Sequence, residues 1–283
     1  MRLREQILIQ ERLAFPDQAL PIFIADKLSM AITAVLLAAA SISWIGSYYL
    51  MPLMMSGGTS GMMAGSGAAA IVSSASLPSV GFFDLVWVIG MAAMMFPAMI
   101  PVVLFYNRVK ARLDPRVALV RFAGTTLFLA GYLVMYAFLG VSVFLVVYAA
   151  ISLSSSVMLP SLLLVIAPSA VLVLAGIYQL TPLKDRCLSN CVSPVGFFAT
   201  HSREGLMGAF RMGFSHGEYC VGCCWAYMLV MLAVGAMSIP VMAALAGLIA
   251  VEKVIVRGSV WFNRIVGVGL ITLGIILVIL PTA

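Results

Sequence analysis

Charge is scarce in this sequence. Only 9% of its 283 residues are Asp, Glu, Lys or Arg, whereas a soluble globular protein carries about 25%. Hydrophobic residues make up 63% of the chain, and several apolar runs reach the roughly 20 residues that cross a bilayer as a helix. Because lipid offers the backbone no hydrogen-bond partner, such runs favour helices. The sequence therefore predicts an all-α, polytopic membrane bundle whose first partner is the lipid bilayer.

Motifs for hydrolysis or phosphate chemistry are missing as well. The chain has no phosphate-cradling glycine loop, no Ser/His/Asp set and no paired carboxylates, which removes support for a hydrolase or an ATPase. Oxygen ligands are not clustered, so a Ca²⁺ or Mg²⁺ site is not indicated. We predict no catalytic residues and no organic cofactor, and favour a transporter or metal-binding membrane protein over an enzyme.

About seven membrane-spanning helices are predicted from the apolar runs. Residues 1–27 mix charged and apolar side chains, which favours a cytoplasmic segment on the membrane surface. Residues 28–283 form a single bundle, with a Met-rich outer loop at 51–81 and a Cys-containing cytoplasmic connection at 181–217. The predicted spans are 28–50, 82–106, 122–149, 157–180, 218–237, 239–256 and 260–280.

Basic residues define the predicted orientation. All 16 Lys and Arg residues fall before the first predicted span, on alternate connections, or close to the connection between the sixth and seventh spans. The positive-inside rule then places the N-terminus in the cytoplasm and the C-terminus outside. The net charge of +6 is thereby explained by topology, so no nucleic-acid partner is expected. Compactness and the lack of appended domains favour a prokaryotic inner membrane.

The five cysteines of the chain are confined to two clusters at one predicted depth. The clusters are Cys187 with Cys191, and Cys220 with Cys223 and Cys224. Both lie on the reducing, cytoplasmic side of the predicted bundle, where structural disulfides are rare. Metal binding or redox exchange is the favoured interpretation. The alternative is that cysteine serves only as a small apolar residue for packing.

The same stretches carry a family resemblance. The chain contains "KDRCLSNCVSP", "GLMGAFRMGFSHGEYCVGCCWAYM" and "AVEK", preceded upstream by "MAAMMFPAMIP". Over about residues 82–254 it resembles the predicted metal-binding integral membrane proteins, a domain of unknown function. The Cys-x-Gly-Cys-Cys-Trp element is the most specific part. In that family an Arg usually follows the second loop cysteine, whereas Val192 stands here. The resemblance implies metal binding and fixes neither the metal nor an activity.

Methionine adds two further groups of sulfur donors. On a helix, the cysteines of 220–224 share one arc of about 140° with Met228 and Met231. The second predicted span carries a methionine face with the same spacing, and the outer loop is also rich in methionine. We predict that the two faces oppose each other and line a path. Its outer half would be covered by Met91, Met94, Met95 and Met99.

Sulfur ligands of both kinds favour Cu(I), because this soft ion prefers thioethers and thiolates. Zinc is the less favoured metal, since it would use histidine or carboxylate ligands and the chain has only His201 and His216. The predicted metal ligands are Cys187, Cys191, Cys220, Cys223, Cys224, His216, Met91, Met94, Met95, Met99, Met228 and Met231.

A few polar residues stand near the predicted spans. His216 and Glu218 precede the thiols by one turn. They could act as a metal ligand, as a base for a thiol or as an outer-shell partner. Alternatively, they form an ordinary pair at the membrane interface. Glu252 and Lys253 are expected to pair with each other or to extend to the interface, with Glu252 facing the thiols. Asp84 is predicted as the N-cap of the second span.

Three function classes remain open from the sequence. The first is a Cu(I) transporter or membrane copper donor that carries the ion between outer methionines and inner cysteines. The second is a membrane thiol–disulfide oxidoreductase, although partner cysteines on the outer side are missing. The third is a non-catalytic subunit of a larger membrane complex, such as a copper enzyme, in which the methionine faces would bind other membrane subunits.

Overall fold

A computed structural model of the protein describes residues 27–56, 77–113, 118–156, 161–235 and 238–279. These residues form helices joined by short turns, as the all-α prediction requires. Most of the predicted surface segment 1–27, together with Met62 and Met63 of the predicted outer loop, lies outside the described residues.

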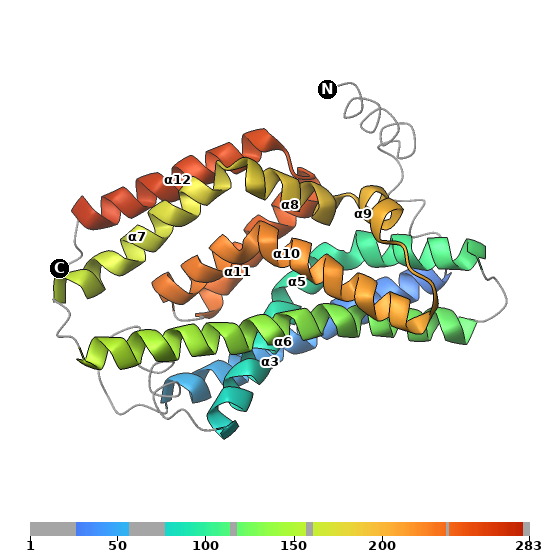
Figure 1. Ribbon diagram of the computed structural model, residues 1–283, viewed down its shortest axis with the longest axis horizontal. Coiled ribbons are helices and arrows are strands. Elements are labelled where there is room, and N and C mark those ends of the chain that lie inside the picture. Colours follow the sequence, from blue (N-terminus) through green and yellow to red (C-terminus); the bar gives the residue numbers. More distant parts are fainter. Residues whose placement is uncertain (1–26, 57–76, 114–117, 157–160, 236–237, 280–283) are drawn as a thin grey trace.

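Ten helical elements follow one another along the described chain (Figure 1). They are α3 (Lys27–Ser56), α5 (Leu77–Leu113), α6 (Ala118–Ser156), α7 (Ser161–Gln179), α8 (Pro182–Val192), α9 (Pro194–His201), α10 (Gly205–Gly235), α11 (Ile239–Ala250), the π-helical turn η1 (Val251–Ile255) and α12 (Val260–Ile279).

Each predicted span coincides with a helix, but the helices differ in how well they suit a membrane. Four contain stretches that are long and apolar enough to cross a bilayer by length and composition. These stretches are Ser29–Leu50, Ser79–Val109, Val120–Ala149 and Val260–Ile279. Many of their large apolar side chains are exposed, among them Tyr49, Phe138 and Ile279, and a lipid environment would cover such surface. The fold is therefore an all-helical bundle with four candidate membrane spans.

One local prediction is wrong because α5 begins earlier than expected. Asp84 is not an N-cap, since α5 starts at Leu77 and Asp84 lies in its second turn. The glycine-rich stretch before the thiols is part of α10, which runs without interruption from Gly205 to Gly235. A glycine costs only about 1 kcal/mol in a helix interior, so close packing against neighbours is enough to keep this stretch helical.

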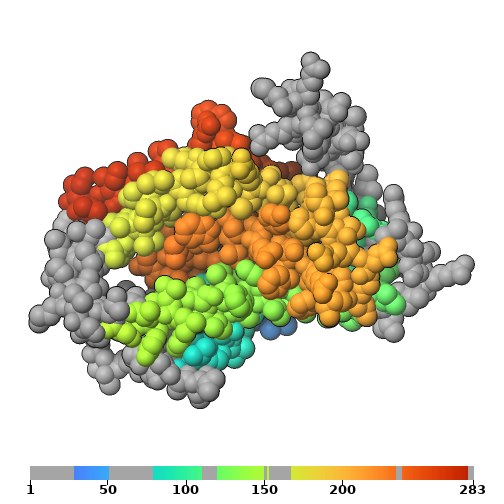
Figure 2. All heavy atoms as spheres, in the orientation of Figure 1, coloured from blue at the N-terminus to red at the C-terminus, as the bar shows by residue number. Residues whose placement is uncertain are grey.

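Helix α10 occupies the middle of the bundle. It packs along α6 on one side and along α7 and α8 on the other, while α3 packs on α5 and α12 packs on α7. Figure 1 shows the α7–α12 pair and the α3–α5–α6 group on opposite sides of α10. In the space-filling view, atoms of α9 and α10 fill the interval between α7 and α6 (Figure 2). The cysteines of α10 thus lie at the centre of the molecule.

Glycines allow α6 and α10 to touch backbone to backbone. A Cβ atom at Gly213 would collide with the carbonyl oxygen of Phe128 and come within 2.7 Å of its carbonyl carbon. One turn further, a Cβ at Gly217 would lie 2.8 Å from the Cβ of Met135. Both contacts move forward along the two chains together, so α6 and α10 run parallel. This close approach fixes the α10 cysteines against the α6 side chains.

We expect Gly213→Ala to destabilise the protein, because the added methyl group meets backbone atoms that cannot rotate away. Overpacking of this kind costs about 1–3 kcal/mol or more. Gly247→Ala is the matched control, since a Cβ there has no atom within 4 Å among the described residues. Thermal unfolding of detergent-purified protein should give a lower midpoint for the first variant only. Equal midpoints would show that α6 and α10 are not packed as closely as described.

Candidate metal centre

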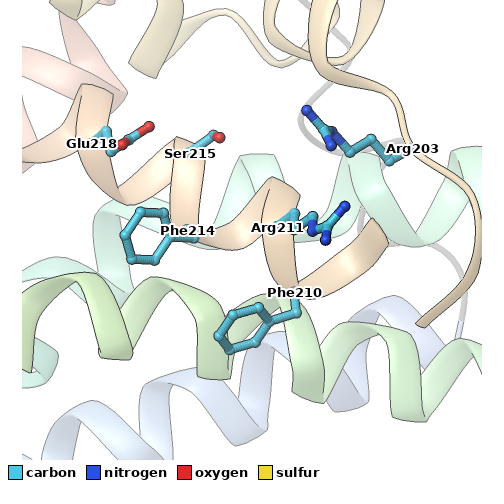
Figure 3. Close-up of a pocket in the computed structure, with 6 residues that line it drawn as sticks. All are labelled: Arg203, Phe210, Arg211, Phe214, Ser215 and Glu218. Carbon is cyan, nitrogen blue, oxygen red and sulfur yellow. The ribbon is translucent and has the colours of Figure 1, made fainter. Parts of the chain in front are cut away.

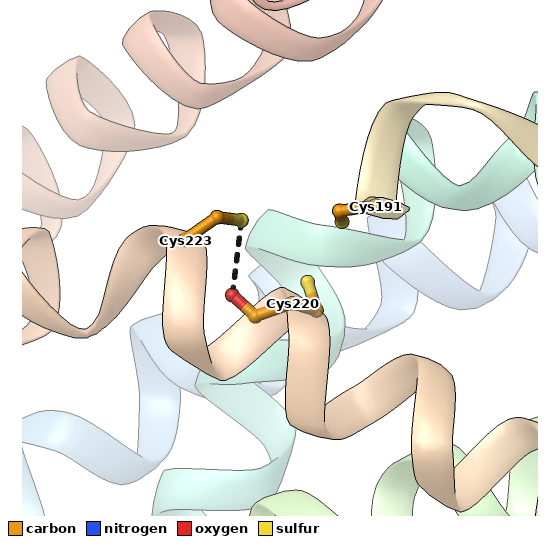
Figure 4. Close-up of side chains that lie close together, drawn as sticks. All are labelled: Cys191, Cys220 and Cys223. Carbon is orange, nitrogen blue, oxygen red and sulfur yellow. Dashed lines mark hydrogen bonds between the residues drawn. The ribbon is translucent and has the colours of Figure 1, made fainter. Parts of the chain in front are cut away.

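Three buried cysteine sulfurs converge on one point between α8 and α10. The Sγ atoms of Cys191, Cys220 and Cys223 all lie within 4.8 Å of one another, and each residue is at most 5% exposed. Cys191 comes from α8, and the two others lie one turn apart on α10 (Figure 4). We call these three residues the thiol centre. Such a group of thiols can supply three ligands to one metal ion.

Helix α8 brings the third sulfur to α10, and its start is well specified by sequence. Thr181 is the N-cap and accepts a hydrogen bond from the backbone N–H of Lys184, and Pro182 occupies the first turn, where its missing N–H is harmless. Cys187 and Cys191 are four residues apart and therefore lie on one face of α8. Cys191 points into the core, whereas Cys187 is half-buried.

Hydrogen-bond donors surround the sulfur of Cys220. Lys253 Nζ donates to Cys220 Sγ at 2.9 Å, and the Tyr136 hydroxyl donates to it at 3.2 Å. The hydroxyl of Tyr132 lies 3.1 Å from the same sulfur. An ammonium group and hydroxyl groups around one sulfur stabilise its thiolate form, which is the form that binds metal. Cys220 is thus prepared as a ligand by its neighbours.

The turn η1 separates two charges that the sequence analysis expected to pair. Lys253 faces the thiol centre, whereas Glu252 forms a 2.7 Å ion pair with Lys184 of α8. Glu252 also accepts a hydrogen bond of 2.8 Å from the Tyr227 hydroxyl, and Lys184 additionally contacts Gln179. The predictions that Glu252 pairs with Lys253 and faces the thiols are therefore wrong. Adjacent helical residues point about 100° apart, so each reaches a different partner.

The two remaining cysteines lie beside the thiol centre. Cys224 is buried and its thiol donates to the backbone oxygen of Cys220 at 2.7 Å, much as Cys223 does at 3.1 Å. Cys187 lies against the α10 backbone, with its Sγ 2.9 Å from where a Cβ at Gly222 would be. Burial, together with the nearby Cys223, raises the pKa of the Cys187 thiol. Cys187 is therefore protonated at neutral pH and must lose a proton before it can bind metal.

His216 and Glu218, which the sequence placed together, point in different directions. His216 is 1% exposed and is enclosed by the rings of Phe128, Tyr132 and Phe197. Its Nδ1 has no hydrogen-bond partner among the described residues, and it does not belong to the three-sulfur group. Glu218 is exposed instead. It lines a surface pocket of about 360 Å³ with Arg203 and Arg211, away from the thiols (Figure 3).

The predicted methionine ligands are all buried in the same apolar core as the cysteines. The exposed fractions of their side chains are at most 4%, so neither the α5 nor the α10 methionine face is turned outward. The residues are Met91, Met94, Met95 and Met99 on α5, and Met228 and Met231 on α10. Whether any of them binds metal stays a prediction, because packing alone also explains buried methionine.

Contacts between aromatic rings show how α5 lies against α6. Phe83 contacts Phe144 with ring centroids 5.5 Å apart, and Tyr106 contacts Phe128 at 5.3 Å, so α5 runs antiparallel to α6. Residues 91–99 lie between these two contacts along α5. That their methionines cover the outer half of a sulfur-lined path stays a prediction.

Four functional-site neighbours were not predicted from the sequence: Tyr132, Tyr136, Lys184 and Tyr227. Lys184 was counted only among the basic residues that set topology, yet its side chain is fully buried. The two α6 tyrosines are spaced by four residues within an apolar run, so they share a helix face. This spacing of two hydroxyl groups was the signal in the sequence that could have pointed to them.

The sequence matches a known protein family. The family model named PpoB2 and described as a copper chaperone matches residues 84–277, which is more than half of the chain. The protein belongs to this family. The match spans the thiol centre, its lysine and tyrosine neighbours and all the predicted methionine ligands. No curated protein and no solved structure matches the chain. Family membership and the thiol centre together indicate copper handling by a protein with four helices long and apolar enough to span a membrane.

Proposed function

We propose that the protein binds Cu(I) at the thiol centre and donates it to a partner. The observation that carries this proposal is the convergence of three buried sulfurs within 4.8 Å of one another. Thiolates are preferred ligands of the soft Cu(I) ion. The family description as copper chaperones supports the same metal.

The charges at the thiol centre can balance a bound Cu⁺ ion. The ion pair of Lys184 and Glu252 is neutral, so the remaining fixed charge beside the sulfurs is the ammonium group of Lys253. One Cu⁺ with two thiolates, one neutral thiol and this ammonium group forms a neutral buried set. A buried net charge is costly. Cu⁺ alone balances one thiolate, and the ammonium group of Lys253 balances a second, so Lys253 stabilises a loaded centre with two thiolates.

Transfer to a partner would use the asymmetry of α8. Cys191 is buried in the centre, whereas Cys187 lies one turn away on the same helix face and is half-buried. A sulfur in this position can take over the ion from the centre and present it at the protein surface. Its raised pKa makes the step depend on removal of a proton, which slows loss of the ion to solvent.

The membrane arrangement is also part of the proposal. About seven helices would cross the bilayer, with the N-terminus in the cytoplasm and the C-terminus outside. The thiol centre would then lie toward the cytoplasmic side, with α5 and α10 methionines supplying weaker thioether ligands on the way. This arrangement is supported by the alternation of basic residues along the sequence and by the four helices suited to a membrane.

Metal analysis of the purified wild-type protein tests the function directly. After anaerobic loading with Cu(I) and removal of excess metal, we expect about one copper per chain, with X-ray absorption showing a shell of sulfur only. A shell of nitrogen or oxygen would contradict a thiol-held ion. A protein that binds no copper but contains a disulfide by mass spectrometry would support the oxidoreductase class instead. Neither copper nor a disulfide would leave the role of a complex subunit.

A further inference from the structure

An acidic side chain and an indole meet α6 one helical turn beyond the thiol centre. Gly140 follows Tyr136 by four residues, so it lies on the same face of α6 about 6 Å further along the axis. A Cβ at Gly140 would be 2.7 Å from Trp87 Cδ1 and would collide with Asp84 Oδ1. The absence of a side chain at Gly140 therefore allows both α5 groups to approach α6 at this point.

Two polar atoms at this point lack partners. Asp84 Oδ1 and Trp87 Nε1 are both inaccessible to solvent and form no hydrogen bond with any described residue. Trp87 is 0% exposed, and its ring stacks on Phe83. Trp87 Nε1 carries a hydrogen and would need an acceptor, so it does not itself point to a cation. Asp84 is half-buried, and its shielded, unpaired oxygen is an acceptor of the kind that commonly marks a bound ion.

The donors available here suit a soft monovalent cation. Asp84, Trp87 and Met91 follow one another at spacings of three and four residues, which places them on one face of α5. They offer one negative charge, the π face of an indole and a thioether. One carboxylate balances one monovalent ion, whereas Mg²⁺ or Ca²⁺ would require several oxygen ligands.

We propose that Asp84, Trp87 and Met91 form a second cation site, in which Cu(I) is held before it reaches the thiol centre. The inference rests on the proposed function for the identity of the ion. Tyr136 lies between the two sites, since its hydroxyl donates to Cys220 Sγ and Gly140 follows one turn later. An ion leaving Asp84 thus reaches the thiols within about two helical turns, or roughly 11 Å.

Silver titration of a protein without thiols tests this site separately. Ag(I) is a soft monovalent probe that is not reduced or oxidised in the assay. In the full-length chain with all five cysteines replaced by serine, we expect bound Ag(I) to quench tryptophan emission. The Trp87→Phe variant should lose this quenching, which would show that the quenched emission comes from Trp87. Asp84→Asn and Gly140→Ala should abolish the quenching, whereas Gly81→Ala, where a Cβ has no atom within 4 Å, should retain it.

The outcomes separate this site from the thiol centre. Absence of Ag(I) quenching in the cysteine-free protein, or unchanged quenching in Asp84→Asn, would overturn the second site even if the wild type binds copper through sulfur. Conversely, Ag(I) binding at Trp87 together with a wild type that takes up no copper would contradict the proposed function but not the second cation site. If the five-serine protein does not accumulate, wild type already loaded with one Cu(I) is titrated with the same variants, and the same criteria decide.

Discussion

Cys220→Ser is expected to abolish tight copper binding. Cys220 contributes the sulfur on which Lys253, Tyr132 and Tyr136 converge, and it is the member of the thiol centre best prepared as a thiolate. Serine keeps the size but replaces a soft ligand by a hard oxygen that stays protonated. The loss of Cu(I) affinity should exceed the roughly 10–100-fold that removal of an outer-shell partner costs.

Competition with a chromogenic Cu(I) chelator under anaerobic conditions measures this loss. Cys187→Ser is the matched control, because this cysteine lies on α8 outside the three-sulfur group and should leave affinity nearly unchanged. Since Cys220 is buried, thermal unfolding of both variants is compared first, so that a folding defect is recognised. Equal affinities of the Cys220 and Cys187 variants would contradict a centre built on Cys191, Cys220 and Cys223.

Lys184→Met is expected to produce the largest loss of stability. Lys184 and Glu252 are 0% and 2% exposed and are 2.7 Å apart, so methionine would leave a carboxylate buried without its counter-ion. Removing one partner of a buried ion pair costs about 3–5 kcal/mol. The midpoint of thermal unfolding in detergent should fall strongly, and copper binding should weaken with it because α8 carries Cys191.

The double variant Lys184→Met with Glu252→Gln distinguishes charge from packing. It removes both charges, and a neutral side chain of the same shape can still accept the Tyr227 hydrogen bond. We expect this double variant to recover most of the lost stability, since replacement of a whole buried pair is often neutral. A double variant as unstable as the single one would mean that packing of the lysine stem, rather than an uncompensated carboxylate, holds α8 in place.

The long apolar helices were predictable from the sequence because apolar length specifies them, whereas α8 and α9 lie within the segment predicted as a connection. The thiol centre was also foreseen as a cluster, since all cysteines fall in two short stretches. Which cysteines would form the centre could not be predicted. Local residues specify that α8 starts at Pro182, but whether Cys187 or Cys191 turns inward also depends on how α8 is rotated against α10. Only tertiary packing sets that rotation. Lys184 was missed for a related reason, because burial of a lysine depends on a partner 68 residues away in sequence, Glu252.

The role of Asp84 was misjudged because the start of α5 has no clear signal. The stretch "LPSVGFF" contains a proline and a glycine, residues that commonly mark a turn, yet it is helical from Leu77. The expected helix start therefore fell several residues too late.

The backbone contacts between α6 and α10 have a consequence for how fast a bound ion can leave. Gly213 and Gly217 join the two helices closely, and the hydroxyls of Tyr132 and Tyr136 contact Cys220 Sγ across this interface. Two of the three sulfurs thus belong to a rigid α6–α10 unit, whereas the third lies on an eleven-residue helix held in part by the buried Lys184–Glu252 ion pair. The rate at which the ion passes from the centre to Cys187 therefore depends on how α8 moves against α10, and so on an ion pair outside the coordination sphere.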